Sequence, residues 1–180
     1  MTNSIYNAIS AWAALLAALA AIYAIWIEGK RSRFAHGLDI LARLSDKFRA
    51  ENMVSVRRSY ASLILDSTKI EAQDKKNDLE DEILDHFQEV SLLTRRHILD
   101  SDLTWAEYGY WFRHYYPLLK NRIKSFREKE DPSGWEDVDW LYCRFQKKDF
   151  YTKACINGEQ IPKDKLTDFL NYESRLPDPK

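Results

Sequence analysis

The feature that most constrains this chain is an uncharged segment of twenty-three residues, Ile5 to Ile27. A helix of this length, rising about 1.5 Å per residue, measures roughly 34 Å and would cross a hydrocarbon core of about 30 Å. Lys30, Arg31 and Arg33 follow the segment directly, where basic side chains favour the cytoplasmic membrane surface. The pattern therefore predicts a transmembrane helix over 5–27, with the N-terminus outside and residues 28–180 forming a cytoplasmic domain.

The predicted span has two different faces. At helical spacing, one face carries bulky apolar residues and the other carries small or polar ones. The small face consists of Asn7, Ser10, Ala14, Ala17, Ala18, Ala21 and, at its end, Glu28. Small residues let a second helix approach closely, so this face is expected to pack against other copies or to line a pore. A dimerising anchor, a ring with a lumen, a cleaved signal peptide and an Ala-rich helix outside a membrane all stay open at this point.

The rest of the chain predicts a helical bundle. Apolar residues recur at three- and four-residue steps through about Arg49, over Met53 to Leu65, and from Asn77 to about Leu99. Asn77 with Glu80 predicts one helix start and Thr104 with Glu107 predicts another, because each pair fits a capping box. The further predicted segments are a helix through Trp105 that bends or breaks at Pro117 and resumes to about Lys129, a helix from Ser133 to about Lys148, a turn at Asn157-Gly158, and a helix from Lys163 to Arg175.

Candidate chemistry is sparse. Arg31 and His36 match the Arg-x4-His spacing of HEPN ribonucleases, in which imidazole would move protons and guanidinium would stabilise a phosphate. The same basic residues fit a role at anionic lipid headgroups. Two cysteines, Cys143 and Cys155, lie outside any ligand-like spacing, so we expect no metal and no cofactor. Asp78, Glu82 and Asp85 are expected to form an ordinary exposed acidic face.

The aromatic sequence WAEYGYWFRHYYP, residues 105–117, has two interpretations. Stacked bases beside Arg113 are one, and a buried stripe is the other. The helical spacing of Trp105, Tyr108, Trp111, Phe112 and Tyr115 favours the buried stripe. Direct binding of nucleic acid is therefore not expected.

The middle of the chain supports a family resemblance. With ILDHFQEVSLLTRRHILDSDLTWAEYGYWF, YYPLLKNRI and GWEDVDWLY, the region from Leu79 to Phe145 resembles small bacterial proteins that have one N-terminal span and a cytoplasmic helical domain. Within that group the chain is similar to the membrane accessory proteins of type VI-B CRISPR systems, which were described as divergent HEPN members. The resemblance implies a ring-shaped homo-oligomer in the bacterial inner membrane, functionally linked to an RNA-guided effector.

Three functions are consistent with these observations. The leading hypothesis is a non-enzymatic oligomer that permeabilises or depolarises the lipid bilayer in antiphage defence. The alternative is a membrane-tethered HEPN-type ribonuclease that uses Arg31 and His36. The third is a membrane adaptor that recruits a cytoplasmic partner through its charged helices.

Overall fold

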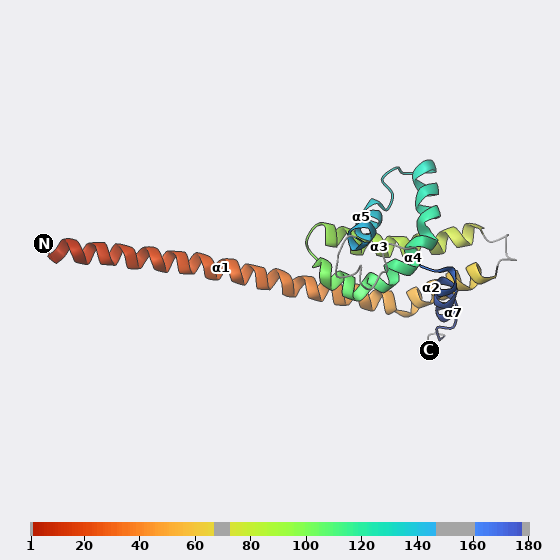
Figure 1. The fold of residues 1–180 in the computed structure, drawn as a ribbon, viewed down its shortest axis with the longest axis horizontal. Coiled ribbons are helices and arrows are strands. Elements are labelled where there is room, and N and C mark those ends of the chain that lie inside the picture. Colours follow the sequence, from red (N-terminus) through yellow and green to blue (C-terminus); the bar gives the residue numbers. More distant parts are fainter. Residues whose placement is uncertain (1, 67–72, 147–160, 178–180) are drawn as a thin grey trace. The chain divides into compact units, whose positions relative to one another are not determined.

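The computed structural model describes the backbone of residues 2–66, 73–146 and 161–177, and within these ranges the side chains except those of 2–11, 13, 14 and 73–75. All regular secondary structure in the described ranges is helical, as labelled in Figure 1. The prediction of an all-α fold with a helical bundle is therefore confirmed. The chain divides into two compact units, Met1–Asp39 and Ile40–Lys180.

Helix α1, Thr2–Arg49, crosses the boundary between the two units. Its end at Arg49 agrees with the apolar periodicity. The predicted transmembrane helix is not supported, however, since no helix in the described part of the chain combines the length and the apolarity needed to cross a membrane. The predicted localisation as a single-pass protein of the inner membrane is therefore not supported by the described structure.

Helix α2, Glu51–Leu65, confirms the predicted second helix, and α3, Gln73–Arg95, begins earlier than predicted. Asn77 lies inside α3, so the predicted capping box at Asn77 and Glu80 is wrong. Glu80 is buried, and its Oε1 accepts a hydrogen bond of 3.2 Å from the Tyr60 hydroxyl and lies 3.4 Å from Lys76 Nζ. Because this carboxylate has tertiary partners, it is not available to cap its own helix.

Helix α3 ends in a Schellman motif, about four residues before the predicted end. The Ile98 amide donates to the Leu93 carbonyl at 3.0 Å, and the His97 amide donates to the Thr94 carbonyl at 3.1 Å. His97 has the left-handed conformation, with φ of 56°, that this motif requires and that glycine normally provides. The absence of glycine at this position explains why the sequence did not reveal the helix end.

Helix α4, Ser101–Lys129, is capped by Asp100 rather than by Thr104. Asp100 Oδ1 accepts hydrogen bonds from the amides of Asp102 and Leu103, at 2.8 and 3.1 Å. The helix continues through Pro117, so a break there is not observed.

Two shorter helices complete the described elements. Helix α5, Glu136–Gln146, and helix α7, Lys163–Ser174, agree with the predicted helices to within a few residues. The predicted turn at Asn157-Gly158 lies outside the described residues. In the second unit α2 packs against α7 and α3, and α3 packs against α4 and α5.

The core of the second unit confirms the buried aromatic stripe. Tyr108, Phe112 and Tyr115 are buried, while Trp105 and Trp111 are partly buried and pack against the same core. The Phe87 and Phe112 rings lie 4.4 Å apart, which joins α3 to α4. Base stacking on this stripe is not consistent with the burial of these rings.

Candidate functional site

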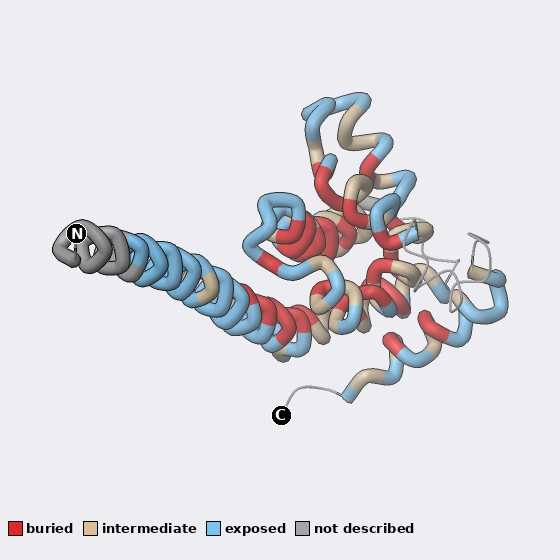
Figure 2. The backbone as a smooth tube through the Cα atoms, turned by 60° about the vertical axis from the view of Figure 1, so that its left-hand side comes forward, coloured by how far each residue is buried: buried red, intermediate tan, exposed pale blue. Residues whose placement is uncertain are grey.

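The exposed apolar side chains of α1 form the first candidate site, in the unit Met1–Asp39. Figure 2 shows this part of α1 as mostly exposed. We define the α1 stripe as seven side chains that follow one another at helical steps and are all at least 49 % exposed: Trp12, Leu15, Leu16, Leu19, Ile22, Tyr23 and Trp26. Contiguous apolar surface on this scale usually marks a contact surface.

The predicted small face lies on the same helix. The side chains of Asn7, Ser10 and Ala14 lie outside the described residues. Four residues of this face are exposed in the single chain: Ala17, Ala18, Ala21 and Glu28. They are therefore accessible to a second helix or to a pore lumen. A protein pore or a second helix against this face stays a prediction.

The three basic residues predicted to contact a membrane surface are also exposed. Lys30 Nζ lies 3.9 Å from the centroid of the Trp26 ring, in a cation–π contact within the helix. Arg33 Nε donates to the Gly29 carbonyl at 3.2 Å, one turn earlier. Both cations are thus directed back along α1 towards the end of the α1 stripe.

Arg31 and His36 are not brought together within one chain. Both side chains are exposed on α1, and residues five apart on an α-helix point about 140° away from each other. One copy therefore lacks the paired arrangement that phosphate chemistry needs. Catalysis by this pair stays a prediction that would require a second copy to provide the missing partner.

A buried charge pair in the second unit is the other candidate site. Arg57 on α2 donates from Nε to Glu173 Oε2 on α7 at 2.9 Å, and Tyr115 on α4 donates its hydroxyl to the same oxygen at 2.6 Å. Arg57 also donates from Nη1 to the Phe48 carbonyl at 3.1 Å. Arg57 and Glu173 are 3 % and 0 % exposed. The cluster therefore joins three helices and the end of α1 at one point.

Aromatic rings enclose the guanidinium of this pair. The Arg57 guanidinium carbon lies 4.4 Å from the centroid of the Phe48 ring and 4.6 Å from that of the Trp111 ring. Burial raises the pKa of Glu173, and the positive charge of Arg57 opposes that effect. Because Arg57, Tyr115 and Glu173 are buried and bonded to one another, the cluster holds α7 against α2 and α4. The sequence carried no signal for it, since Arg57 and Glu173 each stand in an ordinary amphipathic pattern.

His86 is a further buried ionisable group that the sequence did not identify. Its Nε2 lies 3.1 Å from the Tyr108 hydroxyl, and its ring stacks on Phe48 with centroids 5.0 Å apart. Nδ1 is buried and has no hydrogen-bond partner among the described residues. Burial, helped by the positive charge of Lys47, lowers the pKa of His86 to about 4. The imidazole is therefore neutral at pH 7 and belongs to the core.

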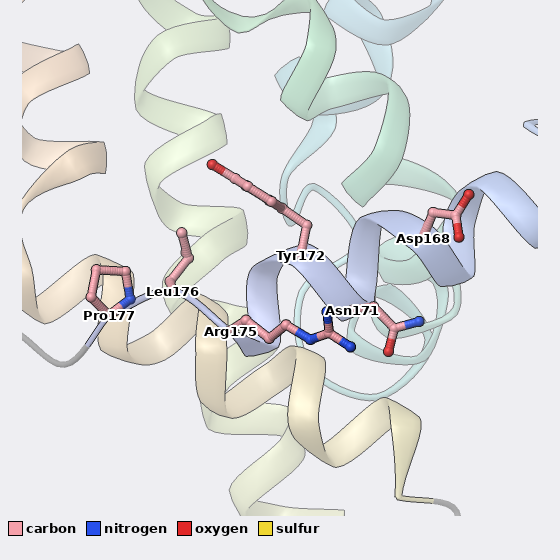
Figure 3. A pocket seen from close by; sticks show the side chains of 6 residues that line it. All are labelled: Asp168, Asn171, Tyr172, Arg175, Leu176 and Pro177. Atoms are coloured by element: carbon pink, nitrogen blue, oxygen red, sulfur yellow. The ribbon is translucent and has the colours of Figure 1, made fainter.

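A surface hollow of about 480 Å³ lies along the end of α7. It is lined by Asp168, Asn171, Tyr172, Arg175, Leu176 and Pro177. Figure 3 shows Asn171 and Arg175 extending to one side of α7 and Tyr172 to the other. Because these side chains diverge and come from a single helix and the segment after it, they do not converge on a ligand.

The acidic face of α3 does not form a metal site in the described part of the chain, where no group of three or more potential ligands is close enough to hold a metal ion. Asp85 is one of the three carboxylates in the predicted face. Its Oδ1 accepts a hydrogen bond of 2.8 Å from Trp135 Nε1. Asp78 and Glu82 are exposed on the same helix. The predicted solvent-facing role is consistent with this arrangement.

Comparison with known proteins gives one match. A family model described as a domain of unknown function, DUF4760, matches residues 11–145. No curated protein and no solved structure matches the chain. The HEPN-like part of the predicted fold gains no support from this match. The resemblance to type VI-B CRISPR accessory proteins also stays a prediction.

Proposed function

The chain belongs to the DUF4760 family, whose function is unknown, and we propose that it acts by assembling with further copies of itself through helix α1. The observation that carries this proposal is the exposure of the α1 stripe. Trp12 and Trp26 are the first and the last of its described side chains, and they are 66 % and 51 % exposed. Burial of such side chains is the main driving force for protein association.

The size of the α1 stripe supports a specific interface. Its seven side chains expose roughly 800 Å² per copy, similar to the surface that each partner buries in an interface of standard size. Tryptophan and tyrosine, which are enriched among the residues that contribute most to binding, make up three of the seven. Self-association therefore accounts for an apolar surface that is exposed in the single chain.

The other predicted functions do not enter this proposal. Membrane permeabilisation, the link to antiphage defence and the recruitment of a cytoplasmic partner stay predictions. The ribonuclease alternative stays a prediction as well, and it is tested by whether His36→Ala abolishes RNA cleavage by the purified protein.

The mass of the purified full chain, measured by light scattering with chromatography, tests self-association. We expect a multiple of the 21.3 kDa chain mass, and a shift towards monomer for Leu19→Glu/Ile22→Glu. The matched control is Ala17→Glu/Ala21→Glu, which places the same two charges on the opposite face of α1 and is expected to leave the mass unchanged. A wild-type monomer, or equal effects of both variants, would refute the proposal. Binding of a monomeric wild-type chain to lipid vesicles would assign the α1 stripe to lipid instead.

A further inference from the structure

The α1 stripe has the same spacing in both directions along the helix. Its described members follow one another at steps of 3, 1, 3, 3, 1 and 3 residues, with Leu19 at their centre and a tryptophan as the first and the last of them. A two-fold axis that passes beside Leu19 would place Trp12 of one copy opposite Trp26 of the other. It would also place Leu16 opposite Ile22. Such a self-complementary arrangement is what an isologous contact between two identical helices requires.

The alternative is a parallel contact, in which each residue meets its own counterpart. Both orientations cover the α1 stripe, so the flanking residues decide between them. Phe34 and Leu38 are exposed beyond the stripe. Phe34 would be covered in either contact, because it falls opposite residue 4 when the axis lies at Leu19, whereas Leu38 would be covered only in the parallel contact. Lys30 and Arg33 lie between them and the stripe on the same side of the helix.

Charge separates the two orientations. In the parallel contact Lys30 would meet Lys30 of the second copy, and Arg33 would meet Arg33, with like charges at contact distance. In the contact centred on Leu19, Lys30 falls opposite residue 8 and Arg33 opposite residue 5, within a segment that carries no charged side chain. Covering Leu38 thus requires four cations to be brought together, which offsets the apolar surface gained.

We infer that two copies of this chain pack their α1 helices antiparallel about a two-fold axis at Leu19. This inference rests on the proposed self-association. The paired α1 stripes form the contact, and Trp12 packs against Trp26 of the second copy.

Disulfide cross-linking of the full chain tests the orientation. Three single-cysteine variants, Leu16→Cys, Leu19→Cys and Ile22→Cys, are made after Cys143 and Cys155 are replaced by serine. All three positions are more than half exposed, so the substitutions leave the second unit intact. Bridged Cα atoms lie about 4.4–6.8 Å apart, whereas an offset of six residues along a helix is about 9 Å.

The expected pattern is specific to the antiparallel pair. Leu19→Cys cross-links with itself on oxidation. Leu16→Cys and Ile22→Cys each stay uncross-linked alone, and an equimolar mixture of the two cross-links in about half of its dimers. Cross-linking of Leu16→Cys alone and of Ile22→Cys alone would show a parallel pair and overturn the inference.

Failure of the proposed function gives a different result. A monomeric mass together with no cross-link at any position would refute self-association itself. An oligomeric mass without a Leu19→Cys cross-link would keep self-association and overturn the two-fold axis at Leu19.

Discussion

The buried imidazole of His86 should make the stability of the second unit depend on pH. In the unfolded chain this group has its ordinary pKa of 6.5, and in the folded chain its pKa is lowered to about 4. As the pH falls below 6.5, the unfolded chain binds the proton first, so the free energy of unfolding decreases. The decrease continues to about pH 4, below which both states are protonated.

The magnitude follows from this pKa difference. Each pH unit between the two pKa values changes the free energy of unfolding by about 1.4 kcal/mol, so His86 alone should remove about 2 kcal/mol between pH 7 and pH 5. The stability from neutral His86 is complete above its unfolded pKa and is lost towards its folded pKa. The substitution His86→Gln removes the titrating group and keeps a side chain that is able to bond the Tyr108 hydroxyl.

Urea unfolding followed by tryptophan fluorescence measures the effect at both pH values. We expect the wild-type chain to lose about 2 kcal/mol more than His86→Gln between pH 7 and pH 5, because the remaining titrating groups are common to both proteins. An equal loss in the two proteins would refute the assignment of a buried neutral imidazole.

Three further variants test the second unit by urea unfolding at pH 7. Arg57→Met leaves the Glu173 carboxylate buried without its cation and should cost about 3 kcal/mol, with partial recovery in Arg57→Met/Glu173→Leu; a loss below about 1 kcal/mol would contradict the burial of the pair. His97→Gly removes the strain of a left-handed residue and should raise the free energy of unfolding by about 0.5–1 kcal/mol, so a decrease would argue against the Schellman motif. Asp100→Ala removes the N-cap of α4 and should cost about 1 kcal/mol, whereas Asp100→Ser should recover most of it.

The sequence predicted a helix correctly where a single periodic pattern of apolar residues ran along it. The pattern from Phe34 to Phe48 predicts a helix up to Arg49, and α1 ends there, because Leu41, Leu44 and Phe48 share one buried face. The helix starts were harder to locate. Glu80 matched a capping box in the sequence, yet its carboxylate bonds Tyr60, a residue that only the tertiary fold brings near.

The two candidate sites also differ in how far the sequence predicted them. The apolar face of α1 was visible in the sequence through the helical spacing of its bulky residues, although the same residues also suggested a membrane span. The pair of Arg57 and Glu173 could not be predicted, because an arginine in an apolar pattern gives no indication of which carboxylate it meets in a distant helix.

The pairing of Arg57 with Glu173 has a consequence for synthesis of the chain. The two residues are 116 positions apart, and a ribosome that adds about 5–20 residues per second needs roughly 6–20 s to pass from one to the other. During that interval the guanidinium has no native carboxylate, and the rings of Phe48 and Trp111 cannot close around a neutral pair. The core between α2 and α4 is therefore completed late, and the nascent chain keeps apolar surface accessible to chaperones until α7 has been made.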